Sequence, residues 1–231
     1  MSVIRRYRSA VVVTRPEPGL SETVQAVEKR NWRAVASPML NIQGMGVLPV
    51  EKARALLVTS GQALPALSEW PRTQAILAVG EKTALRARAM GFEDVAEAGG
   101  DADSLEHYCR GNGLMGTDIV LVTGRGYGVA LAQSLGAVRR EVYDVQLVDA
   151  ITPGTVQVLQ ADCAEAVLFY SGRTVEAFCR AMPDALYARL KGVRALCFSQ
   201  AIAERVPAED WKTVEYGDPL ALLGKRVVSG G

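Results

Sequence analysis

The stretch DIVLVTGRGYGVALAQSLGAVRREVYDVQLVDA, residues 118–150, decides the fold. It begins with a short apolar run, Asp118 to Thr123, of the kind that forms a strand buried on both faces. A glycine-rich turn comes next, followed by helical spacing at 129–135 and an alternating run from Val142. This order predicts a strand–turn–helix–strand unit, the building block of an α/β protein.

Bulk composition narrows the class of protein. The chain has 231 residues, of which 49% are hydrophobic, and its net charge is +1. This size allows one large or two small domains, and the apolar content argues against general disorder. The balanced charge predicts no nucleic-acid partner and no membrane-surface partner. No apolar run has membrane-spanning length, and the run after the first arginines is too short for a secretory leader. We therefore expect a cytoplasmic protein.

The cysteines and the histidine exclude several chemistries. Cys109, Cys163, Cys179 and Cys197 form no CxxC pair, which predicts reduced, structural thiols. His107, the one histidine, lies in a segment with the pattern of an exposed helix, so we expect it at the surface. With one histidine and no clustered thiols, the sequence predicts no metal site and no Ser-His-Asp hydrolase.

Strand and helix patterns alternate along the chain, and the strands are continuous apolar runs, as in parallel sheets covered on both faces. The order also repeats. The segment ALLVTSGQALPAL from Ala55 is echoed by AVLFYSGRTVEAF from Ala166. The segment AILAVGEKTALRARAMGFEDV from Ala75 is echoed by RALCFSQAIAERVPAEDWKTV from Arg194. The repeat predicts two similar parallel-sheet α/β domains.

Two extended segments, 39–45 and 142–150, bracket the middle of the chain. If they pair as a two-stranded hinge, residues 46–141 become a second α/β domain inserted into a first. The first domain is then discontinuous and comprises residues 1–38 and 151–231. We expect two such domains to enclose a cleft at the carboxyl ends of their strands, where α/β sheets bind ligands.

Local signals predict where several helices begin. Ser21 is expected to cap the first helix, and Asp103 or Ser104 a later one. The alternating run ends at Pro153–Gly154, after which the next expected element is the strand from Ala166.

A small hydroxyl residue or a glycine stands at nearly every expected strand-to-helix turn. Helix N-termini offer free N–H groups and the positive end of the helix dipole, which bind anions. Any one of these turns is explained as an ordinary helix cap, but the whole set, with its arginines, predicts a site for a polyanion. The turns are Thr14–Arg15, Thr59–Ser60–Gly61, Gly80 with Thr83, Thr123–Gly124–Arg125, Ser171–Gly172–Arg173 and Ser199.

The turn from Gly124 to Gly128 also resembles a dinucleotide phosphate loop. The fingerprint G-x-G-x-x-G requires a third glycine where this chain has Val129. Asp144 has the spacing of the ribose-binding acid but falls in the expected hinge. A backbone that approaches a ligand at Gly124 and Gly126 explains the glycines as well, so we favour that interpretation.

Five segments resemble the uroporphyrinogen-III synthase family in order and spacing. They are VVVTRPEPG from Val11, LLVTSGQAL from Leu56, AVGEKTALRARAMGF from Ala78, LVTGRGYGVALAQSLGAVRREVYDVQLV from Leu121 and AVLFYSGRTVEAF from Ala166. The resemblance implies two α/β domains on a two-stranded ladder. It also implies a monomeric enzyme of haem biosynthesis that uses no cofactor. Its substrate would be hydroxymethylbilane, a linear tetrapyrrole with eight carboxylates, which it cyclises through a spiro intermediate with inversion of ring D.

The resemblance also implies roles for residues. Tyr143 matches the family tyrosine that assists loss of the substrate hydroxyl, although a tyrosine packed in the hinge ladder is an equal interpretation. Ser60, Thr83 and Ser171 match positions that hydrogen-bond substrate carboxylates. Ile202 departs from the family, which often has a threonine there. The alternative functions are a non-catalytic protein that binds a polycarboxylate and, less favoured, a dinucleotide-dependent enzyme.

Overall fold

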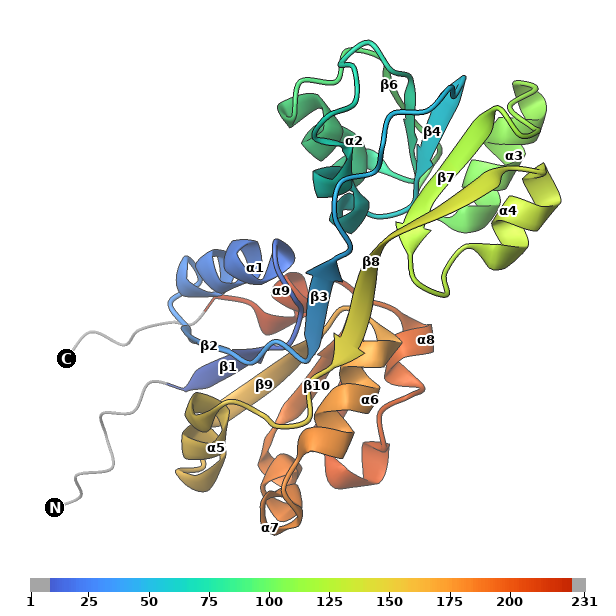
Figure 1. Ribbon diagram of the computed structural model, residues 1–231. Helices are drawn as coiled ribbons and strands as arrows, with labels where there is room; N and C mark the ends of the chain where they lie inside the picture. The colour runs from blue at the N-terminus through green and yellow to red at the C-terminus, as the bar shows by residue number, and fades with distance from the viewer. Residues whose placement is uncertain (1–8, 226–231) are drawn as a thin grey trace, which may run out of the picture. The chain divides into compact units, whose positions relative to one another are not determined.

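The computed structural model describes residues 9–225, which form two compact units. Unit 1 runs to Asn41 and resumes at Gln146, and unit 2 comprises Ile42–Val145. Each unit contains its own β-sheet with helices packed against it (Figure 1). The predicted class, two parallel-sheet α/β domains with the first discontinuous, is confirmed.

Unit 1 is built on a five-stranded sheet in the order β11-β10-β9-β1-β2. Its strands are β1 (Ala10–Val13), β2 (Arg33–Ala36), β9 (Ala164–Phe169), β10 (Arg194–Cys197) and β11 (Thr213–Tyr216). All four strand pairings are parallel. Because β1 lies between β2 and β9, the beginning of the described chain is built into a sheet made largely of late strands. Because all the pairings are parallel, the carboxyl ends of the five strands lie at one edge of the sheet.

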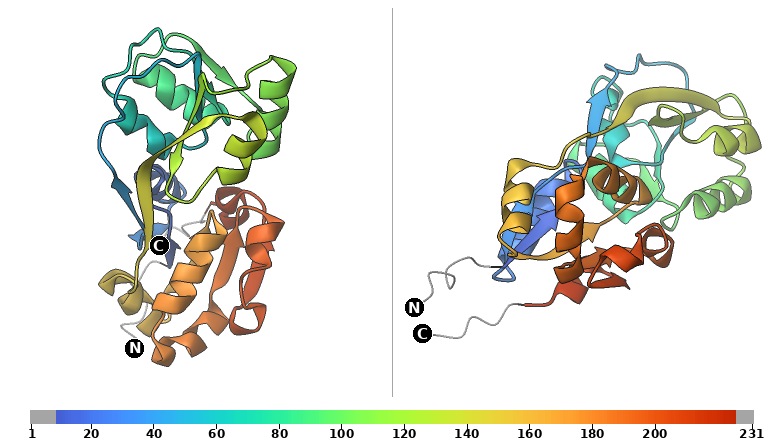
Figure 2. Two further views of the ribbon diagram at one scale, coloured as in Figure 1. Left: turned by 45° about the vertical axis from the view of Figure 1, so that its right-hand side comes forward. Right: turned by 90° about the horizontal axis from the view of Figure 1, so that it is seen from below.

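Helices cover both faces of the unit 1 sheet (Figure 2). They are α1 (Gly19–Glu28), α5 (Pro153–Gln160), α6 (Gly172–Ala181), α7 (Asp184–Tyr187), α8 (Gln200–Ala203) and α9 (Pro219–Leu223), with 3₁₀ turns η3 (Ala188–Gly192) and η4 (Ala208–Asp210). Val12 of β1 points to the core cluster that includes α5 and α6, and Val13 to the cluster with α1 and α9. This alternation is the two-residue period of a strand buried on both faces.

Unit 2 has a six-stranded sheet in the order β3-β8-β7-β4-β5-β6. Its strands are β3 (Leu40–Gly44), β4 (Ala55–Val58), β5 (Ile76–Ala78), β6 (Val95–Glu97), β7 (Ile119–Gly124) and β8 (Val138–Leu147). Its helices are η2 (Gly61–Leu67), α2 (Glu81–Ala89), α3 (Ala102–Gly111) and α4 (Val129–Leu135). Two apolar clusters, one with η2 and α2 and the other with α3 and α4, pack on the sheet.

The two extended segments pair with each other as β3 and β8. The Met45 N–H donates to the Val142 carbonyl at 2.9 Å, and the Val148 N–H donates to the Met39 carbonyl at 3.0 Å. Residue numbers rise along one strand as they fall along the other, so the ladder is antiparallel. β8 begins earlier than the alternating run predicted, because its first residues pair in parallel with β7.

Two predicted helix caps are wrong. Ser21 lies inside α1 and does not cap it. Its hydroxyl donates to Glu17 Oε1 at 2.5 Å, and its N–H donates to the same carboxylate. Asp101, rather than Asp103 or Ser104, caps α3, since its carboxylate accepts the Ser104 N–H at 2.7 Å. In both places a carboxylate earlier in the chain satisfies the free N–H groups of the first turn.

Two helices, α5 and α7, were not predicted. α5 begins at Pro153, directly after Thr152, which is the usual place for a proline at a helix start. The segment after Ser60 is helical, as predicted, but it is a 3₁₀ helix, with Pro65 inside it.

The expectation that His107 lies at the surface is confirmed, and two of the four cysteines lie where structural thiols would. The four cysteines are free, and Cys109 and Cys197 are buried. Burial raises the pKa of Cys197 to about 12, as expected for a structural thiol. His107 is exposed on α3. Within residues 9–225, no helix is long and apolar enough to cross a membrane.

Candidate functional site

Tyr143 lies on β8 against the turn that follows β7. A Cβ on Gly124 would lie 2.5 Å from Cε2 of Tyr143, so only glycine leaves room for the ring. The Arg125 N–H donates to the Tyr143 carbonyl at 2.8 Å, and the Tyr143 hydroxyl hydrogen-bonds with Ser60 at the end of β4. The structure therefore brings together three residues that the sequence analysis selected: Ser60, Gly124 and Tyr143.

The environment of Tyr143 keeps its phenol protonated. The side chain is 6% exposed. Burial raises the pKa of Tyr143 above its ordinary value of 10.0, and the hydrogen bond with Ser60 opposes that shift only in part. At neutral pH the group is therefore a proton donor rather than a base.

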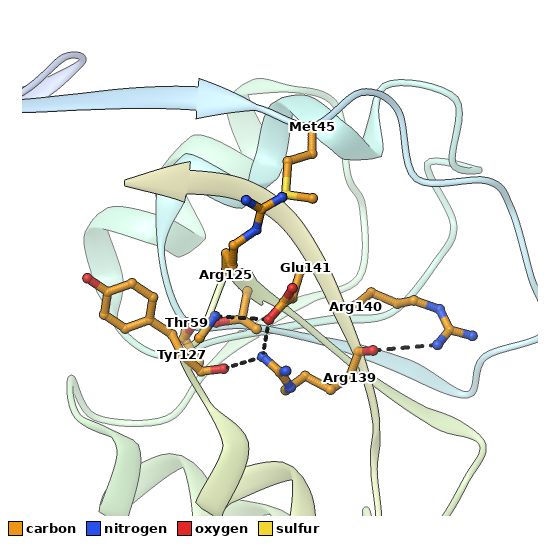
Figure 3. Close-up of polar contacts among 9 residues, drawn as sticks. Met45, Thr59, Arg125, Tyr127, Arg139, Arg140 and Glu141 are labelled. Carbon is orange, nitrogen blue, oxygen red and sulfur yellow. Dashed lines mark hydrogen bonds and ion pairs between the residues drawn. The ribbon is translucent and has the colours of Figure 1, made fainter. Parts of the chain in front are cut away.

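The glycine-rich turn holds a carboxylate of the protein itself (Figure 3). Glu141 Oε1 accepts the Gly126 N–H at 2.9 Å and a proton of Arg139 Nη1 at 2.8 Å. Arg139 Nη1 also donates to the Tyr127 carbonyl at 2.9 Å. Gly126 was predicted to meet a ligand, but its N–H here binds Glu141, which also argues against a dinucleotide phosphate at this turn. Glu141 was not among the residues predicted for the site, because nothing in its own segment marks it.

The contact between Glu141 and Gly126 predicts a pH dependence. The Gly126 N–H, and then Arg139, lower the pKa of Glu141 below its ordinary value of 4.5. The stabilising contact is therefore fully present above that ordinary value and is lost as the pH falls through the lowered pKa. We expect the Gly126 amide resonance to titrate in NMR spectra with its midpoint below 4.5.

Gly136 provides the control for this titration, because its N–H donates to the Gln133 carbonyl and meets no carboxylate. Its resonance should not follow the same curve, and Glu141→Gln should abolish the curve at Gly126. A Gly126 resonance that does not respond to pH would contradict the contact.

Arg125 extends from the same turn towards β8 and β3. Its Nη1 lies 3.3 Å from Asp144 Oδ2. Its Nη2 lies 3.9 Å from Met45 Sδ, and Figure 3 shows these two side chains. The Arg125 side chain is 57% exposed, and ion pairs this exposed contribute little to stability. Arg125 can therefore exchange Asp144 for another carboxylate at low cost.

Two further predicted residues of unit 2 begin helices. Gly61 is the first residue of η2, and Thr83 lies in the first turn of α2, with its N–H donating to the Gly80 carbonyl at 3.0 Å. Thr83 is 8% exposed, so a ligand has little access to its hydroxyl in this structure.

In unit 1, the predicted residues lie at the carboxyl ends of β1, β9 and β10. Ser171 caps α6, with its hydroxyl accepting the Thr174 N–H at 3.3 Å, and Gly172 and Arg173 are the first two residues of that helix. Ser199 precedes α8 without a side-chain cap bond. Ile202 is 9% exposed and packs in the core, so this turn has an apolar anchor where the family often has a threonine.

Arg15 follows β1 and reaches across to the neighbouring strand. Its Nη1 donates to Thr23 Oγ1 at 3.2 Å, and its Cζ lies 4.4 Å from the centre of the Tyr170 ring. Tyr170 was not selected from the sequence, although it directly precedes the predicted turn at Ser171.

The predicted site residues thus fall into two sets, one on each unit. Unit 2 carries Ser60, Gly61, Thr83, Gly124, Arg125, Gly126 and Tyr143, and unit 1 carries Arg15, Ser171, Gly172, Arg173 and Ser199. Within residues 9–225, the structure contains no group of three or more histidine, cysteine, aspartate or glutamate residues placed to hold a metal ion.

One family model matches most of the chain. The family model described as uroporphyrinogen-III synthase HemD matches residues 21–216. The structure of uroporphyrinogen-III synthetase from Helicobacter pylori is similar, with a TM-score of 0.58 and 15% identity, covering 94% of this chain and 97% of that one. A mutant uroporphyrinogen III synthase from Thermus thermophilus gives a TM-score of 0.52 and 18% identity, covering 93% and 96%. A comparison with curated proteins gave no match. At these identities the two structures show likeness of fold alone.

Proposed function

This chain belongs to the uroporphyrinogen-III synthase HemD family, and we propose that it cyclises hydroxymethylbilane to uroporphyrinogen III with inversion of ring D. Membership of the family makes the chain a lyase of porphyrin biosynthesis that acts on a tetrapyrrole. One observation supports Tyr143 as the residue that acts on the substrate: the buried side chain contacts Gly124 and Ser60.

In the proposed reaction, Tyr143 gives its phenolic proton to the hydroxyl on ring A. The C–O bond breaks, water leaves, and an azafulvene that is still protonated on nitrogen remains beside the tyrosinate. Ring D attacks the azafulvene through its substituted carbon to form a spiro intermediate, which fragments and closes again with ring D inverted. The proton lost when the last pyrrole is restored returns to Tyr143. Tyr143 is protonated at neutral pH, as a general acid must be, although burial also raises its pKa and so makes the phenol a weaker acid.

The balance of this reaction is loss of water and isomerisation, with no net oxidation, so we propose that it needs no cofactor. The enzyme's contribution is then to hold the substrate so that the substituted carbon of ring D is the one attacked.

The substrate carboxylates are proposed to bind at the strand ends of each unit. Ser60, Gly61, Gly124, Arg125 and Gly126 would bind them in unit 2, and Arg15, Ser171, Gly172, Arg173 and Ser199 in unit 1. Thr83 would join them only once its hydroxyl, which is buried here, is uncovered. Charge-assisted hydrogen bonds from arginines and backbone N–H groups are the interactions suited to carboxylates. At Gly126 the substrate would have to replace Glu141.

We place the hinge at residues 39–45 and 142–150, with residues 46–141 as the inserted domain and residues 1–38 and 151–231 as the first domain. The β3–β8 ladder supports this placement, because the division between the compact units falls inside both strands. Residues 1–8 and 226–231 lie outside the described part of the chain. We also propose that the chain acts as a monomer in the cytoplasm, which light scattering and cell fractionation would test.

The activity is tested by supplying freshly made hydroxymethylbilane and resolving the uroporphyrin isomers after oxidation. We expect the type III isomer, because uncatalysed closure gives only the uninverted type I isomer. If a polycarboxylate stabilises the protein against unfolding but only the type I isomer forms, the chain is a binding protein and the proposal is wrong.

A further inference from the structure

Three glycines that begin a helix each leave room for an arginine side chain. A Cβ added to any of them would meet an arginine atom at under 3.0 Å. The pairs are Gly19 of α1 with Arg15, Gly172 of α6 with Arg205, and Gly61 of η2 with Arg86. The first two pairs lie in unit 1, at the ends of the neighbouring strands β1 and β9.

The backbone does not require glycine at Gly19 or Gly172. Neither residue is among the glycines with a positive φ, so any L-residue could adopt their conformation. Glycine at such a position makes the unfolded chain more flexible without relieving strain. The arginine side chains occupy the space that a Cβ would take, so a larger residue at either position would displace the far end of a flexible arginine.

The helix dipoles disfavour both arginines. α1 and α6 have 10 residues each, and their N-termini carry the positive end of the helix dipole, which repels a guanidinium. Within residues 9–225, the structure gives neither Arg15 nor Arg205 an acidic ion-pair partner. An anion bound at this edge would remove the repulsion, and local conflicts of this kind are characteristic of functional sites.

An aromatic pair with one exposed ring adjoins Arg15. Tyr170, at the end of β9, has the Arg15 guanidinium over its ring at 4.4 Å. On the neighbouring strand end, Phe198 stacks on Tyr170 with ring centres 6.0 Å apart and an interplanar angle of 28°. Phe198 is 54% exposed, so a flat apolar side chain faces solvent at the same edge as two cations.

Given the proposed function, we propose that Arg15, Arg205 and Phe198 form a subsite for one pyrrole ring of the substrate. Each ring of hydroxymethylbilane carries two carboxylates, and the two arginines bind one each. Guanidinium groups bind carboxylates through two parallel hydrogen bonds, which fixes the ring's orientation. Phe198 stacks on the face of the same ring. Gly19 and Gly172 have no side chain, which leaves room for Arg15 and Arg205 at these positions.

The first test separates the charge of Arg205 from its position. Arg205→Ala removes the charge, and we expect the KM for hydroxymethylbilane to rise about tenfold or more. Gly172→Ala keeps the charge but displaces the side chain, and we expect a smaller rise in KM with no loss of thermal stability. In the Arg205→Ala background, Gly172→Ala should have no further effect on KM.

Unit 1 offers matched controls for both changes. Gly192 has nothing within 4 Å of an added Cβ, and Arg189 is an exposed arginine paired with Asp162 at 2.7 Å. Gly192→Ala and Arg189→Ala should leave KM unchanged. For the stacking contact, Phe198→Ala should raise KM and the fraction of type I isomer, and Phe198→Tyr should restore both. Unchanged KM in both Arg205→Ala and Gly172→Ala would overturn the subsite.

A probe with a single ring tests the subsite without turnover. A monopyrrole with one acetate and one propionate, titrated into the wild-type protein, should shift the NMR resonances of Phe198 and Gly172, and its diester should not. If the wild type makes type III isomer but neither the titration nor the variants respond, the subsite is wrong and the proposed function stands. If the wild type makes only type I, the proposed function fails, and the titration alone decides whether this edge binds a pyrrole dicarboxylate.

Discussion

Replacing Tyr143 by phenylalanine is expected to lower kcat about 100-fold and to leave KM nearly unchanged. The change removes the hydroxyl and keeps the ring that packs on Gly124, so the fold is preserved while the proton donor is lost. Loss of a general acid typically costs about 10²–10⁴ in rate. Because uncatalysed closure of the substrate continues, the fraction of type I isomer should rise. Initial rates and isomer ratios measured with hydroxymethylbilane test both expectations.

Two variants separate chemistry from packing. Ser60→Ala keeps the tyrosine but removes its hydrogen-bond partner, and it should cost less in kcat than Tyr143→Phe. Tyr108→Phe, on α3 of the same unit, should leave kcat unchanged. If Tyr143→Phe turns over at the wild-type rate, Tyr143 serves only the packing of the β3–β8 ladder.

Replacing Phe169 by alanine is expected to destabilise unit 1 by about 3–5 kcal/mol. Phe169 is fully buried at the end of β9. Its ring meets Phe178 edge-on at 5.6 Å and Trp211 at 5.8 Å. Removing it therefore leaves a cavity beside these two rings. Hydrogen exchange followed by mass spectrometry measures the result, because peptides of the unit 1 sheet should exchange faster in the variant.

The peptides of unit 2 serve as an internal control, since that unit has its own core. Phe198→Ala is the matched substitution, because Phe198 is 54% exposed and its removal should cost about 0.5 kcal/mol or less. Equal protection of the β9 peptides in wild type and Phe169→Ala would show that Phe169 does not support the core.

Elements with a strong local pattern could be predicted from the sequence. The helices at Val129–Leu135 and Pro219–Leu223 have the predicted bounds, because a glycine or proline marks their starts. The start of β8 could not be predicted in this way. Its first residues are Val138-Arg139-Arg140-Glu141, a largely charged run, and they are a strand because they hydrogen-bond to β7. α5 does carry local signals, a proline at its first residue and buried residues at helical spacing that pack on the unit 1 sheet, although it was not predicted.

The residues of the candidate site also divide into those that could be predicted from the sequence and those that could not. Ser60, Ser171 and Gly124 could be selected from the sequence, since turn residues follow from local backbone chemistry. Glu141 and Arg205 could not, because each reaches its partner from another segment of the chain. The structure also gives Gly124 a role other than the predicted one. Its φ is not positive, and its lack of a side chain makes room for the Tyr143 ring.

By itself, then, the sequence determined two α/β units, the order of their elements and the residues at their turns, because periodicity and turn chemistry act over a few neighbouring residues. Only the tertiary structure decided what occupies those turns: Glu141 at Gly126, Arg205 at Gly172 and Tyr143 at Gly124. The physical reason is that these contacts join side chains brought together across neighbouring strands and helices. Their distances depend on the packing of whole elements, which no local pattern encodes.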